Sequence, residues 1–120
     1  MVSSLAIVIG GSGGIGRALA QRLSDSPTHD LVLSVSRRRP EGWIDTPRQA
    51  WIAADILDED SLVRAAAHAA GLGVPSRVLV ATGQLHGPGL APEKSMRSLD
   101  LAPLTALFAT NAAGPALAAK

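Results

Sequence analysis

The sequence predicts an α/β fold with a parallel sheet of the doubly wound type, and three observations support this prediction. Apolar runs that suit buried strands alternate with segments whose apolar residues recur at helical spacing. A glycine cluster joins the first expected strand directly to the first expected helix. The chain has 120 residues, the length of one ordinary domain, and contains no repeat, low-complexity tract or linker. We therefore expect residues 1–120 to form one domain.

The first half of the chain is expected to contain two strands and one helix. Residues 5–9 form a continuous apolar run, as in a strand that is buried on both faces of a parallel sheet. From Ile15 onward the apolar residues have helical spacing, and Ser26-Pro27 ends that helix. A second strand is expected at residues 31–36, and the basic segment 37–40 follows it.

The second half is expected to add two strands and two helices. Asp58 can cap the first of these helices, which extends to about residue 70, because its acidic residues lie at the positive end of the helix dipole. Pro103 fits the first turn of the last helix. The two strands and the Gly- and Pro-rich loop that follows them are expected at residues 51–54, 78–81 and 83–92.

The composition excludes several classes of function. The 11 basic and 10 acidic residues give a net charge of +1, which argues against nucleic-acid binding because phosphates are neutralised by an excess of Lys and Arg. The chain has no cysteine, and His86 lies in a loop without a second histidine at ligand spacing, so no metal site is expected. Aromatic residues make up 2% of the chain and tyrosine is absent, so a base-stacking platform is not expected either.

No segment is expected to cross a membrane or to direct secretion. Charged residues, Gly or Pro interrupt every apolar run before the roughly 18 residues that a membrane span needs. Residues 1–9 lack the basic start of a secretory signal, and glycines follow at once. We therefore expect a soluble, cytoplasmic protein.

The glycine cluster at residues 10–16 is the strongest functional signal in the chain. A strand that turns into a helix through glycines lets backbone N–H groups approach a pyrophosphate at the positive end of the helix dipole. The strand before the cluster and the helix after it are the context that a dinucleotide-binding fingerprint requires. The alternative is a tight turn without a ligand. The candidate cofactor-binding residues of this loop are Gly10, Ser12, Gly13, Gly14, Ile15 and Gly16.

The residues at the end of the second expected strand indicate which dinucleotide binds. An NAD site usually has an acid there for the ribose 2′-hydroxyl. This chain has Ser36 followed by Arg37 and Arg38 instead. A guanidinium can bind a 2′-phosphate through two parallel hydrogen bonds, so we expect NADP rather than NAD, with both arginines at the cofactor. The alternative is that these arginines are only a solvated charge run.

Two further positions each have two interpretations. Asp55 either accepts a hydrogen bond from an adenine amino group or is a helix-entry carboxylate beside Asp58. Asn111 lies four residues before Pro115, which has no N–H, so a helix that continued there would be kinked and would leave the Asn111 carbonyl free for a water or ligand. Spacing alone favours the simpler interpretation, in which Gly114-Pro115 ends the helix.

Residues 10–20, with Arg37 and the pair Asp55-Ile56, resemble the short-chain dehydrogenase/reductase family. Residues 108–115 resemble the asparagine-bearing helix of that family, and residues 85–87 with 92–95 are similar to its C-factor-like subgroup, named after a cell-to-cell signalling protein. The resemblance covers nearly the whole chain. It implies a Rossmann-type NAD(P)-binding domain whose sheet stops after about four strands and the helix that precedes a fifth.

The resemblance also implies roles for individual residues. Asn111 would hold a water of a proton relay through its main chain, and Gly83 would permit a close approach to the cofactor. The chain departs from the family at Ile9, where threonine is usual, and at residues 80–83, which read Val-Ala-Thr-Gly in place of Asn-Asn-Ala-Gly. The implied cofactor contacts are Gly10, Gly14 and Gly16 at the pyrophosphate, Arg37 at the 2′-phosphate, and Asp55, next to Ile56, at the adenine.

The catalytic serine and the Tyr-x-x-x-Lys pair of this family follow the asparagine in sequence, and residues 1–120 contain neither of them. Hydride transfer to a carbonyl needs a proton donor at the developing alkoxide, which the family supplies as that tyrosine. We therefore expect the cofactor-binding half of an NADP-preferring short-chain oxidoreductase for a small-molecule carbonyl or alcohol. This half should be inactive by itself.

Two other hypotheses remain beside this one. The chain is either a small dinucleotide-binding module that regulates without chemistry, or a fragment that has no stable fold alone. The last possibility arises because the fourth strand and the last helix would leave apolar surface uncovered. Homo-oligomers are a further expectation, since related chains pair through the last helix.

Overall fold

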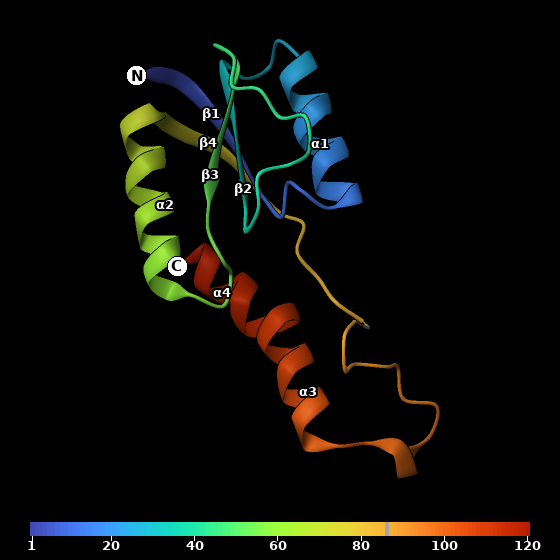
Figure 1. Ribbon diagram of the computed structural model, residues 1–120. Helices are drawn as coiled ribbons and strands as arrows, with labels where there is room; N and C mark the ends of the chain where they lie inside the picture. The colour runs from blue at the N-terminus through green and yellow to red at the C-terminus, as the bar shows by residue number, and fades with distance from the viewer. Residues whose placement is uncertain (86) are drawn as a thin grey trace.

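Within residues 1–85 and 87–120, which the computed structural model describes, four parallel strands form one sheet. The strand order is β3-β2-β1-β4, so the chain starts in the interior of the sheet and adds strands on both sides (Figure 1). The fold class predicted from the sequence is confirmed. The strands are β1 (Val2–Ile9), β2 (Leu31–Ser36), β3 (Gln49–Ala53) and β4 (Gly73–Val80).

Helices cover both faces of the sheet. The helix α1 (Gly14–Asp25) lies on one face, and α2 (Glu59–Leu72) lies on the other, where the end of the chain also returns (Figure 1). Asp58 caps α2 as expected, because its carboxylate accepts a hydrogen bond from the Ser61 N–H at 3.3 Å. The remaining elements are a 3₁₀ turn, η1 (Met96–Ser98), and three consecutive helical segments, α3 (Leu101–Phe108), η2 (Ala109–Ala113) and α4 (Gly114–Ala119).

The core consists of two apolar clusters, one on each face of the sheet. Successive side chains of a strand point to opposite faces, so the uninterrupted apolar run of β1 supplies both clusters. Leu5 packs with residues of α2, whereas Ala6 and Val8 pack with Ala20 of α1. The sequence predicted this two-sided burial for residues 5–9 of β1, and all six residues of β2 are buried as well.

The strand β4 is longer than the sequence indicated, and part of its apolar surface is uncovered, as expected for the fourth strand. It begins at Gly73, directly after α2, and not at residue 78. At Gly73 a Cβ atom would lie 2.5 Å from Val2 Cγ2, so glycine lets the two strands approach closely where they begin. β4 is an edge strand in the described residues, and Val78 and Val80 keep 49% and 39% of their surface exposed.

The last helix does not end at Gly114-Pro115, and the simpler interpretation of these residues was wrong. The helix continues to Ala119 because its backbone switches to π geometry over residues 109–113, where the Gly114 N–H donates to the Ala109 carbonyl, five residues earlier. This local widening accommodates the missing N–H of Pro115 without ending the helix. A Cβ atom at Gly114 would lie 2.8 Å from Ile56 Cγ1, so glycine also lets the helix pack against the loop after β3.

Residues 101–119 therefore form one continuous helix of 19 residues with a mean hydropathy of 1.2. By length and composition it is long enough to cross a membrane, and the expectation that no segment reaches this length was wrong, since Pro103 and Pro115 do not interrupt the helix. Core helices of soluble proteins reach the same values, so the helix by itself assigns no membrane location. Only 6% of it is buried in this structure, and much of it projects away from the sheet (Figure 1).

Asp30 connects the start of β2 to the start of β1 and provides a test of this arrangement. Its Oδ2 atom accepts hydrogen bonds from Ser3 Oγ at 2.8 Å and from the Ser4 N–H at 3.0 Å. These bonds lower the pKa of Asp30 below its ordinary value, and the bond from the Ser3 hydroxyl contributes most. A lowered folded-state pKa means that the carboxylate stabilises the fold above the usual aspartate pKa near 3.9, and that this stabilisation is lost as the pH falls through the lowered value.

We predict that Asp30→Asn slightly lowers the unfolding temperature at pH 7. The difference from the wild type should shrink below about pH 4 and vanish at lower pH, because the carboxyl then becomes neutral in both states of the wild type. Thermal unfolding followed by circular dichroism between pH 2.5 and 7 measures this. A difference that does not change with pH would contradict the prediction.

Candidate functional site

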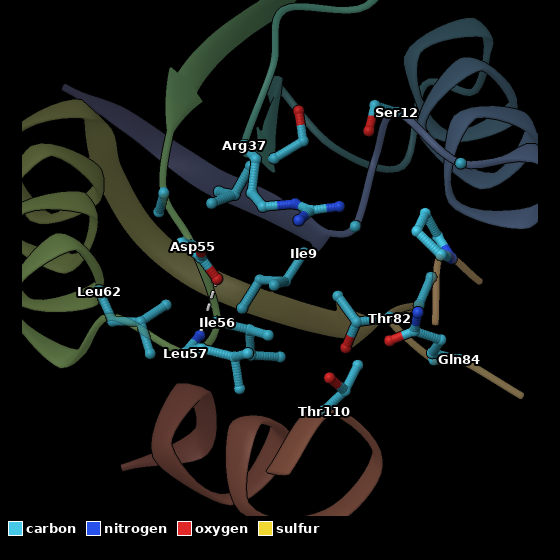
Figure 2. Close-up of a pocket in the computed structure, with 18 residues that line it drawn as sticks. Ile9, Ser12, Arg37, Asp55, Ile56, Leu57, Leu62, Thr82, Gln84 and Thr110 are labelled. Atoms are coloured by element: carbon cyan, nitrogen blue, oxygen red, sulfur yellow. Dashed lines mark hydrogen bonds between the residues drawn. The ribbon is translucent and has the colours of Figure 1, made fainter. Parts of the chain in front are cut away.

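A cavity of about 540 Å³ lies at the carboxyl edge of the sheet, where all four strands end (Figure 2). Ligands of open parallel α/β sheets bind at this edge. Its wall is completed by Thr110, from the π turn of the last helix. The lining residues are Ile9, Gly10, Ser12, Gly13, Val35, Ser36, Arg37, Ala54, Asp55, Ile56, Leu57, Leu62, Ala81, Thr82, Gly83, Gln84, Pro88 and Thr110.

The loop between β1 and α1 forms one side of the cavity. Gly10 has a φ of 89° and comes so close to the end of β4 that a Cβ atom would lie 2.9 Å from the Ala81 carbonyl carbon. Gly16 must lack a side chain for another reason, because a Cβ atom there would collide with the Gly10 carbonyl. A Cβ at Gly14, by contrast, meets no atom within 4 Å. Gly10 and Gly16 are therefore required by the fold itself, and Gly14 is not.

Within the described residues, no side chain caps the start of α1. Its N-cap residue, Gly13, has no side chain to accept a hydrogen bond, and the first turn contains no acidic residue. Unsatisfied N–H groups at the positive end of a helix attract anions. Gly13 and Ser12 line the cavity, so this end of the helix borders it.

The three arginines after β2 have different surroundings. Arg39 forms an ion pair with Asp45 at 3.2 Å, and its guanidinium lies 5.5 Å from the ring centre of Trp51. Arg37 reaches from the end of β2 into the cavity, as Figure 2 shows, and has no ion-pair partner among the described residues. Arg38 does not line the cavity. Of the two arginines predicted to bind the cofactor, only Arg37 lines the cavity.

Asp55 lies where β3 leads into α2, and both interpretations of this residue have support. Its Oδ1 atom accepts a hydrogen bond from the Leu57 N–H at 2.9 Å, which stabilises the turn that enters the helix (Figure 2). Asp55 also lines the cavity, together with Ile56. The hydroxyl of Ser61 steadies this turn from the helix side, since it donates to the Asp58 carbonyl at 2.7 Å. The carboxylate thus has a structural contact and also borders the cavity.

Asn111 fixes the loop after β4 through its side chain. Its Oδ1 atom accepts from the Gln84 N–H at 2.7 Å, and its Nδ2 atom donates to the Gln84 carbonyl at 2.6 Å. Both hydrogen bonds go to the backbone of one residue, so the Asn111 side chain connects the helix to the loop through a pair of bonds. The sequence suggested a role for the main chain of Asn111 and gave no sign of this contact, because the two residues are far apart in the chain.

The structure brings most of the predicted site residues to this cavity and leaves some outside its lining. Those that line it are Gly10, Ser12, Gly13, Arg37, Asp55, Ile56 and Gly83. Those that do not are Gly14, Ile15, Gly16, Arg38 and Asn111. The sequence reasoning missed Thr82, Gln84 and Thr110, although the position of Thr82 and Gln84 just after a strand was a usable signal.

The polar groups of the cavity suit an anionic ligand. A cationic guanidinium and the open end of α1 both face it, and Thr82 contributes a buried hydroxyl that has no hydrogen-bond partner in the described residues. Within residues 1–85 and 87–120, no group of three His, Cys, Asp or Glu side chains could hold a metal ion. His86, which was expected to bind no metal, lies outside the described residues.

Comparison with known families gives a direct match. A family model described as the NAD dependent epimerase/dehydratase family matches residues 6–77. This range begins in β1 and ends in β4, so it includes the glycine loop, Arg37 and Asp55. A search of curated protein sequences finds no significant match.

Solved structures of short-chain dehydrogenases and reductases have the same fold. The NADPH-bound carbonyl reductase from chicken fatty liver matches with a TM-score of 0.78 and 18% identity over 99% of this chain and 46% of that chain. A protein of Burkholderia multivorans assigned to the short-chain dehydrogenases/reductases, solved with bound NADP, has a TM-score of 0.74 and 20% identity over 98% and 51%. An NADH-dependent reductase in complex with NAD has a TM-score of 0.72 and 18% identity over 98% and 49%.

These matches support the resemblance seen in the sequence and establish the fold. The chain spans about half the length of these structures, which it covers to 46%, 51% and 49%. The three proteins differ in the cofactor that their descriptions name, so the shared fold does not distinguish NADP from NAD.

The different surroundings of two glycines lead to a prediction about stability. Gly16→Ala should destabilise the fold by about 1–3 kcal/mol or more, because the new Cβ atom would displace the Gly10 backbone. Gly14→Ala should leave stability unchanged or raise it by up to about 1 kcal/mol, since alanine is the better helix former and has open space there. Urea unfolding of both variants measures these effects. Equal losses in the two variants would contradict this account of the loop.

Proposed function

Because the chain belongs to the NAD dependent epimerase/dehydratase family, we propose that its cavity binds a nicotinamide dinucleotide, as the cofactor-binding half of a short-chain oxidoreductase. The observation that carries the proposal is the placement of two anion-binding features, the open N-terminus of α1 and the free guanidinium of Arg37, at one cavity. A volume of about 540 Å³ is in the range of small-molecule sites. When bound, such a cofactor supplies or accepts the hydride of the reaction.

The residues of the chain can be assigned to parts of the dinucleotide. The pyrophosphate lies at the glycine loop and the start of α1, where backbone N–H groups are free to donate. The adenine lies beside Asp55 and Ile56, whose side chains offer a hydrogen-bond acceptor and an apolar surface. Gly83 lines the cavity just beyond the end of β4. The substrate in this proposal is a small carbonyl compound or alcohol.

We assign Asn111 a supporting role in the proposed reaction. Both polar atoms of its side chain are engaged by the Gln84 backbone, so we assign the water of the proposed proton relay to its main chain. The side chain fixes the loop that carries Gly83 and Gln84 along the cavity. This role is one of positioning and does not require contact with the reacting atoms.

The proposed cofactor is NADP rather than NAD. The strand β2 ends without an acid that would bind a ribose 2′-hydroxyl and repel a phosphate. Arg37 instead directs an unpaired cation into the cavity, and a guanidinium matches the geometry of a phosphate dianion. The neighbouring Arg38 lies outside the lining and is not needed for this preference.

We predict that Arg37→Ala weakens NADPH binding by roughly 10- to 100-fold, the effect of losing hydrogen bonds to a charged group. NADH binding should change by less than about threefold, because NADH has no 2′-phosphate to lose. Isothermal titration calorimetry of both cofactors against the 120-residue chain measures these affinities.

Arg38→Ala is the matched control for this experiment, since it removes the same charge from the next residue. It should weaken NADPH binding by no more than about threefold, an effect of net charge alone. A larger loss for Arg38→Ala than for Arg37→Ala would contradict the assignment of the 2′-phosphate to Arg37. Tighter binding of NADH than of NADPH by the wild type would contradict the preference for NADP.

A second candidate function is a dinucleotide-binding module without chemistry of its own. The observation that favours it is the absence of tyrosine from the 120 residues, because a carbonyl reduction needs a proton donor at the developing alkoxide. Lys120 does not replace it, since its ammonium group is paired with Glu59 at 2.9 Å and the residue does not line the cavity. Both candidate functions require the cofactor site. They differ in whether catalytic residues act together with that site.

We predict that the 120-residue chain binds NADPH but does not oxidise it with carbonyl substrates faster than a buffer control. The loss of absorbance at 340 nm, measured with a panel of aldehydes and ketones, tests this. Turnover well above the buffer control would show that the chain contains a proton donor that we have not identified, and would exclude the module without chemistry.

A further inference from the structure

A chain of hydrogen bonds connects the strand β3 to the turn that carries Arg37. The indole N–H of Trp51 donates to Ser36 Oγ at 2.9 Å, and Ser36 Oγ donates to the Arg38 carbonyl at 2.7 Å. Ser36 is 6% exposed and Trp51 is half-buried, so water competes little for these bonds. Together they fix the backbone on the C-terminal side of Arg37.

The register of the sheet explains why these two side chains meet. β2 and β3 are parallel, and Ser34 of β2 is paired with Trp51 of β3. Residues two apart on a strand share a face, so Ser36 lies on the same face as Ser34 and diagonally opposite Trp51. A long aromatic side chain spans this diagonal, and its N–H reaches the Ser36 hydroxyl.

The hydroxyl of Ser36 has no proton left for a ligand, although the residue lines the cavity. A serine hydroxyl carries one proton and two lone pairs. The proton is donated to the Arg38 carbonyl, and one lone pair accepts from Trp51. A phosphate needs donors, so Ser36 can contact one only by giving up the bond to Arg38. The Trp51 N–H helps to hold the same oxygen in place, because it donates to it at 2.9 Å.

The guanidinium of Arg39 packs over the ring of Trp51. It lies 5.5 Å from the centre of that ring and pairs with Asp45 at 3.2 Å. The three consecutive arginines, Arg37, Arg38 and Arg39, thus make different contacts. Arg37 faces the cavity, Arg38 provides the carbonyl that Ser36 holds, and Arg39 packs on Trp51.

We propose that Trp51 and Ser36 are positioning residues for cofactor selectivity, because they fix the turn that directs Arg37 toward the 2′-phosphate of NADP. This inference rests on the proposed function, since it assumes that Arg37 binds that phosphate. Trp51 does not line the cavity, so it acts on the cofactor only through Ser36 and the turn.

The test is a comparison of NADPH and NADH affinities by isothermal titration calorimetry for the wild-type chain, Trp51→Phe, Ser36→Ala and the double variant. Each single variant should weaken NADPH binding about three- to tenfold, as expected for the loss of one buried hydrogen bond. NADH binding should stay within about twofold of the wild type. The double variant should be no weaker than the weaker single variant, because both substitutions break the same connection.

Trp43→Phe is the matched control. It also removes an indole N–H, which donates to Asp45 at 2.7 Å, but this contact is exposed and does not reach Ser36. The ratio of NADPH to NADH affinity should therefore stay within about twofold of the wild type. Thermal unfolding of every variant shows whether it is folded, and Ser36→Ala provides the test if Trp51→Phe does not fold.

Each outcome separates this inference from the proposed function. A wild-type chain that does not prefer NADPH would overturn the proposed preference for NADP. A wild type that prefers NADPH, with the same preference in Trp51→Phe, would overturn only the positioning role. Equal losses of NADPH and NADH affinity, or additive losses in the double variant, would also overturn it, because they indicate a general structural effect.

Discussion

The close approach of β1 to its neighbours at Gly10 is the constraint on which the site depends. Gly10 donates its N–H to the Val35 carbonyl of β2 at 2.8 Å and lies against the backbone of Ala81 after β4, with a φ of 89°. A side chain at this position would separate the three strand ends. The same turn directs the start of α1 toward the cavity, because the Gly13 N–H donates back to the Gly10 carbonyl at 3.3 Å. One glycine therefore sets the width of the cavity and the direction of its helix.

The opposite wall depends on a helix that is continuous where the sequence suggested an end. Its π turn presents Thr110 to the cavity and Asn111 to the loop after β4. Gly114, at the end of this turn, packs against Ile56, which borders the same cavity. The helix is thus held at both sides of the site, even though most of it is exposed. Irregular helical turns are frequent at functional sites, and this one carries both of these polar side chains.

Much of the fold could be predicted from the sequence because its signals are local. The limits of β2 and the capping of α2 by Asp58 follow from runs of apolar residues and from helix-capping chemistry, which act within a few residues. The candidate site was accessible for the same reason, since parallel strands end at one edge and place Gly10, Arg37 and Asp55 there. The course of the last helix could not be predicted in this way, because the rule that proline ends a helix considers only the α-helical hydrogen-bond pattern.

The sequence by itself determined the class of the fold, the order of its elements and the family to which the chain belongs, all of which depend on residue patterns along the chain. Only the tertiary structure decided which of three consecutive arginines faces the cavity and which residues hold that turn in place. The tertiary structure also decided that the side chain of Asn111 contacts the backbone of Gln84. Such contacts join residues that are distant in the sequence, and their geometry depends on strand register and helix packing, which no local pattern encodes.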